Sequence, residues 1–199
     1  LTILYIIVYN RLVKEKNVKD YKFKTKPYDH QLKAWKDSWS AKFYALFMEM
    51  GTGKSKVAID TIGALYKDKK ITAALIVAPK GVYDNWVKGE IPTHLPNDIN
   101  RMVVRWTPST SKKFQDEMKA LVYDPFDGLK IFVMNIEALS TPRGTKAAYM
   151  FLVKNCANIM VVDESTTIKN RKATRTKNVM MLAKDAKYRR ILTGSPVTK

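Results

Sequence analysis

An apolar run from Phe43 to Phe47 leads into Gly51-Thr52-Gly53-Lys54-Ser55, where a helical pattern begins. This order predicts a strand, a glycine-rich turn and a helix, the arrangement that cradles nucleotide phosphates. The glycines let backbone N–H groups face phosphate oxygens, while Lys54 would reach the outer phosphates and the Ser55 hydroxyl would bind Mg²⁺. Met48 stands where the general P-loop pattern has its first glycine. The alternative is a glycine turn before a helix that binds no ligand.

Strand and helix patterns alternate along the whole chain. Strands are expected at 43–48, 73–78, 101–106, 130–134, 158–162 and 188–193, and helices at 29–39, 54–67, 82–89, 112–123, 145–155 and 171–186. Several strands are continuous apolar runs, which is typical of a sheet with both faces covered. The sequence therefore predicts an α/β fold, a mostly parallel β-sheet with helices on both faces. Ligands of such sheets bind at the carboxyl ends of the strands.

Two further polar motifs follow predicted strands. Asp163 and Glu164 end an apolar run, where one carboxylate can hold Mg²⁺ through water and its neighbour can orient the attacking water. An isolated Asp-Glu pair is usually a solvated acidic turn, so this interpretation depends on the lysine loop upstream. Thr193 and Ser195 carry hydroxyls on a turn that Gly194 and Pro196 sharpen, a composition that is ordinary by itself.

The chain is strongly basic. It has 199 residues and a net charge of +18, from 36 basic and 18 acidic side chains. Such a domain usually has a polyanionic partner, most often nucleic acid, although the charge can also be solvated surface. Between 165 and 190 the apolar spacing predicts a buried helical face with the charge outward, either as a solvated helix or as a phosphate-tracking surface. The basic residues there are Lys169, Arg171, Lys172, Arg175, Lys177, Lys184, Lys187, Arg189 and Arg190.

The single cysteine, Cys156, excludes an intrachain disulfide and favours a reducing compartment. We therefore expect an intracellular protein, cytoplasmic if prokaryotic or viral and nuclear if eukaryotic. The apolar run Leu1 to Tyr9 is shorter than the roughly 20 residues of a membrane helix and lacks the features of a signal peptide. It predicts a buried strand and no membrane partner. The chain starts without Met and stops soon after Pro196, so we expect a fragment of a longer protein.

Five stretches in a fixed order resemble the first RecA-like domain of superfamily 2 helicases and translocases, closest to the Swi/Snf-type DNA-dependent ATPases. They are Pro27 to Trp35 (PYDHQLKAW), Met50 to Ser55 (MGTGKS), Leu75 to Pro79 (LIVAP) with Asn85-Trp86, Val161 to Ser165 (VVDES) with Ile168-Lys169-Asn170, and Leu192 to Pro196 (LTGSP). The combined match spans 27 to 196 and is far more specific than any one motif. It implies a RecA-like P-loop NTPase domain over 27–199, with 1–26 as an N-terminal extension packing on it.

The resemblance also implies roles for individual residues, with ATP and Mg²⁺ as cofactors. Lys54 and Ser55 match the phosphate and magnesium residues, and Asp163 and Glu164 match the magnesium and water-activating carboxylates. Gln31 would read the adenine edge, although it could instead only bond its own helix end. The positions that would contact the nucleic-acid backbone are Pro79, Lys80, Asn135 and Glu137, and those that would couple ATP state to nucleic-acid binding are Thr193 and Ser195.

Two positions depart from the family pattern. Ser165 and Thr166 replace the Ala-His that usually follows the acidic pair, which puts histidine-mediated coupling in doubt, and Ser195 stands where Thr is commoner. The lone His30 and His94 have no ligand spacing, so we assign them no metal. The tryptophans are expected in the core rather than as base-stacking platforms; they are Trp35, Trp39, Trp86 and Trp106.

Together these features favour an ATP-binding first motor domain of a DNA-dependent ATPase, a helicase or translocase that couples ATP hydrolysis to movement on, or remodelling of, nucleic acid. Duplex DNA is the favoured partner. A second RecA-like domain in the parent chain would complete the motor, so the fragment alone should hydrolyse ATP weakly or not at all. The alternatives are a non-hydrolysing nucleic-acid-binding scaffold, an RNA helicase and a small-molecule kinase. The motif order and the net charge argue against the kinase.

Overall fold

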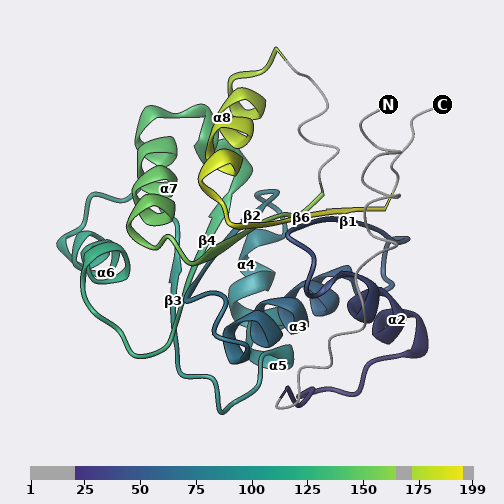
Figure 1. Cartoon of the computed structure of the whole chain (residues 1–199). Helices are drawn as coiled ribbons and strands as arrows, with labels where there is room; N and C mark the ends of the chain where they lie inside the picture. The colour runs from purple at the N-terminus through teal and green to yellow at the C-terminus, as the bar shows by residue number, and fades with distance from the viewer. Residues whose placement is uncertain (1–20, 165–171, 195–199) are drawn as a thin grey trace.

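Six strands form one parallel sheet in the computed structural model of the chain, which describes residues 21–164 and 172–194 (Figure 1). The strand order is β1-β6-β5-β2-β4-β3, and every neighbouring pair is parallel. The strands are β1 (Phe43–Phe47), β2 (Ala73–Ala78), β3 (Arg101–Arg105), β4 (Leu129–Asn135), β5 (Asn158–Val162) and β6 (Tyr188–Thr193). The predicted strands are confirmed to within a residue or two at each end.

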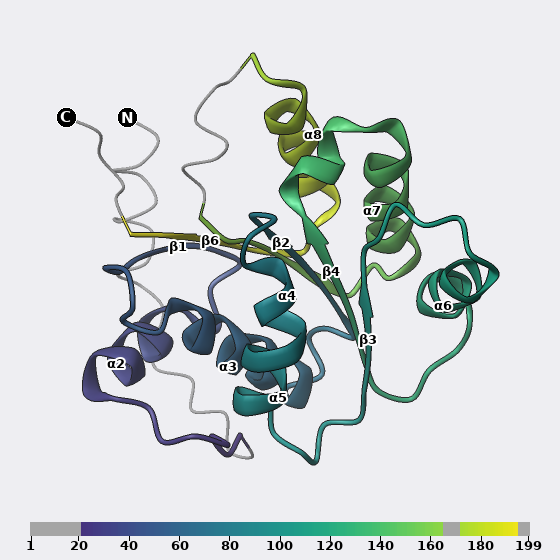
Figure 2. The same ribbon diagram turned by 180° about the vertical axis from the view of Figure 1, so that it is seen from behind.

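Helices cover both faces of the sheet (Figures 1 and 2). One face carries α2 (Asp29–Ser38), α3 (Lys54–Lys67), α4 (Tyr83–Asn85), the π-helical turn η2 (Trp86–Glu90) and α5 (Ile91–His94). The other face carries α6 (Lys112–Tyr123), the 3-10 turn η3 (Ile136–Ser140), α7 (Pro142–Lys154), α8 (Thr174–Leu182) and the 3-10 turn η5 (Ala183–Asp185). No helix among the described residues is both long and apolar enough to cross a lipid bilayer.

The central strands have no solvent-facing side, which explains their continuous apolar sequence. Every residue of β2 and β5 is buried. Along β2, Ala74 and Ile76 belong to the core beneath α2 and α3, whereas Leu75 and Val77 belong to the core beneath α6, α7 and α8. Alternate side chains of one strand thus enter two separate cores, as the two-residue period of a strand requires.

The helix expected at 82–89 differs most from the prediction. It is divided into α4, the π-helical turn η2 and α5, and it continues to His94. Pro92 lies within α5 and has no backbone N–H to donate into the preceding turn. A wider π turn just before it accommodates the change in hydrogen-bond register, and such turns are frequent at functional sites.

Arg190 contradicts the expectation that the charge between 165 and 190 lies outward. Its side chain is fully buried, and its guanidinium donates to backbone carbonyls of Ser38 (2.8 Å), Ala41 (2.7 Å) and Arg189 (2.8 Å), among others. Burial lowers the pKa of Arg190 to about 10, which leaves it charged at neutral pH. The group therefore satisfies the carbonyls between the end of α2 and the start of β1 instead of facing a partner.

The described part of the N-terminal segment packs on the domain. Tyr21 is 9% exposed, stacks on Trp35 and donates its hydroxyl to Asp60 Oδ1 (2.7 Å), while Phe23 contacts the same cluster. The strand expected at Leu1 to Tyr9 lies outside the described residues.

Candidate nucleotide site and nucleic-acid edge

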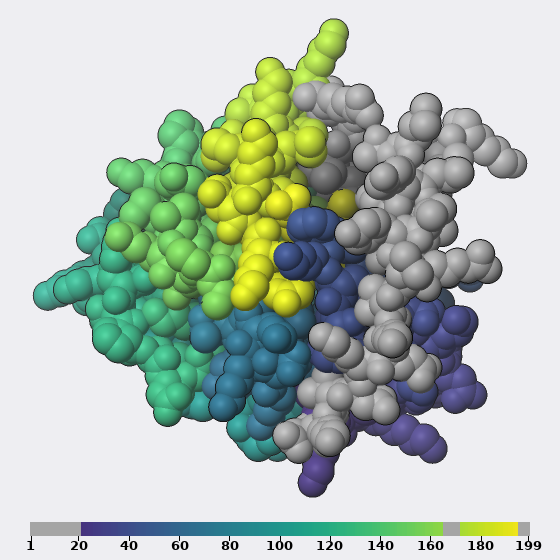
Figure 3. All heavy atoms as spheres, in the orientation of Figure 1, coloured from purple at the N-terminus to yellow at the C-terminus, as the bar shows by residue number. Residues whose placement is uncertain are grey.

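The polar motifs that follow β1, β5 and β6 lie at one edge of the sheet, because all strands run in the same direction. Thr193 pairs with Phe47 at the end of β1, and Val162 pairs with Val77 near the end of β2. The space-filling view shows β1 and β6 side by side although they lie far apart in the sequence (Figure 3). The convergence expected for the glycine loop, the acidic pair and Thr193 is confirmed. Ser195 lies outside the described residues.

Two glycines of the loop after β1 adopt backbone conformations that side chains disfavour. Gly51 and Gly53 have φ angles of 78° and 84°. A Cβ at Gly53 would also lie 2.3 Å from Gln31 Nε2, so this position excludes a side chain on two grounds. The loop passes directly into α3, whose first residue is Lys54. Its backbone therefore has the turn geometry and the helix N-terminus that bind phosphate elsewhere.

Lys54 folds back over its own loop. Its ammonium donates to the carbonyl oxygens of Met48 (2.9 Å) and Glu49 (2.8 Å). The Met48 amide in turn donates to the Thr193 carbonyl at 3.3 Å, which ties the start of the loop to the end of β6. Met48 does not have a positive φ angle, so its backbone conformation does not require glycine. This explains how the chain tolerates Met at the first glycine position of the pattern.

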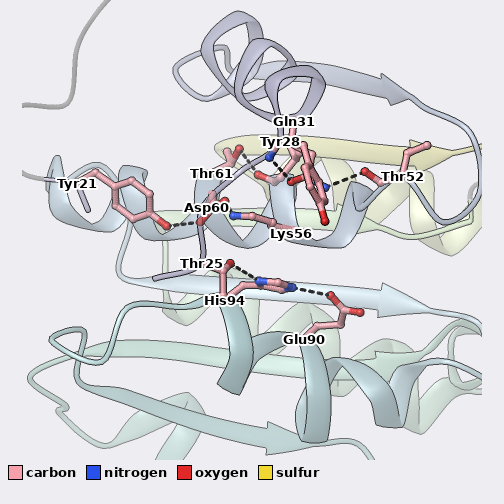
Figure 4. Close-up of polar contacts among 11 residues, drawn as sticks. Tyr21, Thr25, Tyr28, Gln31, Thr52, Lys56, Asp60, Thr61, Glu90 and His94 are labelled. Atoms are coloured by element: carbon pink, nitrogen blue, oxygen red, sulfur yellow. Dashed lines mark hydrogen bonds and ion pairs between the residues drawn. The ribbon is translucent and has the colours of Figure 1, made fainter. Parts of the chain in front are cut away.

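Gln31 makes the helix-end bond that the sequence left open and a second bond, to the glycine loop, that the sequence did not predict. Its Oε1 accepts from the amide of Tyr28, the N-cap residue of α2 (3.1 Å), so it does bond its own helix end. Its Nε2 donates to the Thr52 carbonyl (3.0 Å), so it also holds the glycine loop (Figure 4). Each amide atom keeps one further hydrogen-bonding site, enough to reach one base edge.

A cavity of about 510 Å³ joins Gln31 to the glycine loop. Its lining residues are Thr25, Lys26, Tyr28, Gln31, Gly51, Gly53, Lys54, Ser55, Lys56, Glu90 and His94. Sequence reasoning missed the wall formed by Glu90 and His94. His94 Nδ1 lies 2.7 Å from Thr25 Oγ1 and its Nε2 lies 3.6 Å from Glu90 (Figure 4). Burial, together with the charges of Lys56 and Lys24, lowers the pKa of His94.

Asp163 follows β5 with both carboxylate oxygens engaged. Oδ2 accepts from Trp86 Nε1 and Oδ1 accepts from the Glu164 amide, each at 2.9 Å. Burial raises the pKa of Asp163; the two hydrogen bonds and Lys54 oppose that shift, and Glu164 adds to it. Glu164 has a φ angle of 48°, in the left-handed region that a non-glycine residue rarely adopts. Such strain is concentrated at functional sites.

The residues assigned to nucleic acid meet at the same edge of the sheet. Ala78 and Asn135 pair at the ends of β2 and β4, which places the exposed Lys80, after Pro79, near the Asn135 turn. Asn135 Nδ2 donates to Glu137 Oε2 at 3.1 Å. The fold thus brings these four residues to adjacent loops.

The tryptophans are confirmed as core residues. Their exposed fractions are 8% for Trp35, 4% for Trp39, 1% for Trp86 and 5% for Trp106, so none is a base-stacking platform. Sequence reasoning missed the hydrogen bond from Trp86 to Asp163. Across residues 21–164 and 172–194, no three His, Cys, Asp or Glu side chains gather as a metal site.

The sequence is similar to a known family and to larger curated proteins. The profile of the SNF2-related domain matches residues 35–199. The chain is 28% identical over 153 residues to the SWI/SNF-related matrix-associated actin-dependent regulator of chromatin subfamily A containing DEAD/H box 1 of Xenopus tropicalis, across 75% of this chain and 14% of the relative. It is 28% identical over 180 residues to the chromatin-remodeling ATPase INO80 of Saccharomyces cerevisiae, across 85% of this chain and 11% of that protein. The chain thus spans a small part of each relative.

The fold is similar to that of solved structures. The Sulfolobus solfataricus SWI2/SNF2 ATPase core in complex with dsDNA superposes with a TM-score of 0.63 and 22% identity, and the match covers 92% of this chain and 35% of that one. At this identity the likeness establishes the fold, and the predicted RecA-like architecture is confirmed.

Proposed function

This chain belongs to the SNF2-related domain family, and we propose that it is the first, ATP-binding motor domain of a DNA-dependent ATPase. The observation that carries the proposal is the meeting of Lys54, its glycine loop and Asp163 at one sheet edge. In the proposed division, residues 27–199 form the motor domain and 1–26 an extension of it. A second RecA-like domain of the parent chain would complete the motor and move it on duplex DNA.

The glycine loop and the start of α3 suit a triphosphate. Backbone amides at Gly51 and Gly53 would face phosphate oxygens, and the α3 N-terminus adds favourable partial charge. The Thr52 amide would first have to release the Glu49 carbonyl, to which it donates at 3.4 Å. Lys54 would exchange the two loop carbonyls for the outer phosphates. Because those carbonyls are neutral acceptors, a doubly charged phosphate would compete for the ammonium successfully.

The acidic pair suits metal-assisted hydrolysis. We assign Mg²⁺ to Ser55 and Asp163, partly through water, and activation of the attacking water to Glu164. Mg²⁺ usually relies on one or two carboxylates plus substrate phosphates, which agrees with the lack of an all-protein metal cluster in the described residues. When bound, Mg²⁺ would offset phosphate charge, while Glu164 would orient the water and take its proton.

Gln31 suits the adenine end of the nucleotide. The remaining Nε2 proton and Oε1 lone pair match the N7 acceptor and the N6 donor of adenine, whereas guanine presents an acceptor in place of that donor. The cavity it shares with Lys54 has the size expected of a ligand site. Gln31→Ala should therefore reduce the preference for ATP over GTP in competition binding.

Lys54→Ala tests nucleotide binding directly. Loss of the ammonium should weaken binding of fluorescent ATP by about tenfold or more, as removal of a charge-assisted contact would. The matched control is Lys119→Ala, which removes an exposed lysine from α6. Equal affinity in wild type and Lys54→Ala would rule out the phosphate assignment.

Glu164→Gln tests the chemistry in the longer parent protein. The amide keeps the shape of the side chain but cannot accept a proton, so ATP should bind normally while hydrolysis falls by about 100-fold or more. A wild-type hydrolysis rate would contradict the role of Glu164. If neither protein hydrolyses ATP with or without duplex DNA, the non-hydrolysing scaffold becomes the better description.

The strand-end loops that carry Lys80 and Asn135 would bind the nucleic-acid backbone. Binding to duplex DNA should lack sequence preference and weaken with salt, and Lys80→Ala should reduce the log–log salt slope by about 0.9. The rival surface is α8, tested by Arg175→Ala and Lys177→Ala. If the slope responds to those two changes and not to Lys80→Ala, the DNA-binding face lies on α8. If no change matters, the charge of +18 is solvated surface.

A further inference from the structure

Trp86 makes a contact that a merely space-filling tryptophan would not make. Its ring is 1% exposed, and its Nε1 donates to Asp163 Oδ2 at 2.9 Å across 77 positions of sequence. Trp35 is also buried, yet its indole N–H has no acceptor in the described part of the chain. The two buried indoles therefore differ, because that of Trp86 bonds a carboxylate and that of Trp35 has no acceptor among the described residues.

The contact completes the fixation of one carboxylate. The Asp163 amide donates to the Val77 carbonyl (2.8 Å), which holds its backbone against β2. The Glu164 amide holds Oδ1 and Trp86 holds Oδ2. A carboxylate that accepts a hydrogen bond at each oxygen cannot rotate without losing one of them, and each oxygen retains a further lone pair for another ligand.

The helical turn that carries Trp86 is itself anchored beside Asp163. The Pro79 carbonyl, just after β2, accepts from the amides of Val82 and Tyr83, so α4 starts directly at the end of the strand that pairs with β5. Trp86 then opens the π-helical turn η2, whose wider spacing changes the direction of the following side chains. The segment from β2 through α4 thus places the Trp86 indole beside the Asp163 carboxylate at the end of β5.

We propose that Trp86 is a positioning residue for the magnesium site, and that its indole N–H holds Asp163 in the orientation that receives Mg²⁺ with the nucleotide. This inference rests on the proposed function, because Asp163 is the assigned magnesium carboxylate. Trp86 does not line the cavity that joins Gln31 to the glycine loop. Its effect should therefore appear in the Mg²⁺ requirement of nucleotide binding, not in metal-independent affinity.

The test is a titration of the whole chain with N-methylanthraniloyl-ATP at a series of Mg²⁺ concentrations and in EDTA. In Trp86→Phe, the Mg²⁺ concentration for half-maximal binding should rise by about tenfold, the ratio expected for loss of a hydrogen bond to a charged acceptor. Affinity in EDTA should stay the same. The matched control is Trp35→Phe, which should leave the Mg²⁺ midpoint unchanged because its indole N–H has no acceptor among described residues.

A double-mutant cycle separates positioning from general damage. Asp163→Asn should also raise the Mg²⁺ midpoint, and adding Trp86→Phe to it should raise the midpoint no further. Additive shifts, or an unchanged midpoint in Trp86→Phe, would overturn the inference. If Trp86→Phe does not fold, benzothienylalanine at position 86 keeps the ring shape without the N–H donor and should give the same shift. Absence of any Mg²⁺-dependent binding in the wild-type chain would instead reject the proposed function.

Discussion

The two edges of the parallel sheet treat polar side chains in opposite ways. At the amino-terminal edge, Arg190 and Asn158 are fully buried, and both bond to backbone groups. Asn158 Nδ2 contacts the carbonyls of Leu152 (3.0 Å), Asn155 (2.9 Å) and Asp185 (3.2 Å), and its Oδ1 accepts from the Lys187 amide (3.0 Å). These side chains satisfy backbone groups at the ends of helices and strands.

At the carboxyl-terminal edge, Lys54 and Asn135 are partly exposed and make contacts that a ligand can replace. Lys54 holds two carbonyls of its own loop, and Asn135 bonds one neighbouring side chain. The strained φ of Glu164 and the two left-handed glycines also lie at this edge. The contrast teaches that a buried cation bound to several backbone carbonyls supports the fold, whereas a cation on the carbonyls of its own loop can exchange them for a ligand.

The largest expected effect comes from the buried guanidinium. Arg190→Met should lower the free energy of unfolding by about 3–5 kcal/mol, because it leaves several buried carbonyls without a donor. Lys54→Met, at the opposite edge, should change it by less than about 1 kcal/mol. Urea unfolding of both variants measures the difference. Similar losses in the two would remove the distinction between the edges.

A matched pair of asparagines gives an intermediate effect. Asn158→Ala should cost about 2–3 kcal/mol, since the variant loses hydrogen bonds to three carbonyls and one amide in a buried site. Asn135→Ala should cost less than about 0.5 kcal/mol, because its hydrogen bond to Glu137 is exposed to solvent. Chemical unfolding curves compare the two, and an equal cost would mean that burial does not set their importance.

The smallest effect concerns pH at the cavity between Gln31 and the glycine loop. The lowered pKa of His94 means that the unfolded chain takes up this proton first as pH falls. Stability should therefore decline from about pH 6.5 downward, until pH reaches the lowered pKa of the folded state. His94→Asn should remove that part of the slope, while His30→Asn should retain it because His94 is still present. If the dependence of stability on pH is the same in His94→Asn, other titrating groups cause it.

Much of the fold was predictable because its signals are local. Apolar runs such as Ala73 to Ala78 reflect burial on both faces, and the left-handed turn at Gly51 and Gly53 needs residues without a Cβ. Parallel pairing then forces the strand-end motifs to one edge. For the same reason, Lys54, Asp163 and Thr193 could be grouped at that edge from the sequence alone.

Other features could not be predicted because they depend on contacts between distant segments. In the sequence, Arg190 looks like one more surface charge in a basic stretch. It is a buried donor only because residues 38–42 pack against the start of β6. Trp86 reads as a core residue, and it is one, but its hydrogen bond exists only because β2 and β5 are neighbours. No periodicity of a single element encodes either partner.

The sequence by itself determined the succession of strands and helices along the chain, the glycine loop and the family. Short-range patterns determine these features, because they reflect backbone conformation and burial on one or both faces. The tertiary structure decided which polar groups support the fold and which remain available to a ligand. It decided this through burial, since a charge or amide takes its role from the donors, acceptors and solvent that long-range packing places around it.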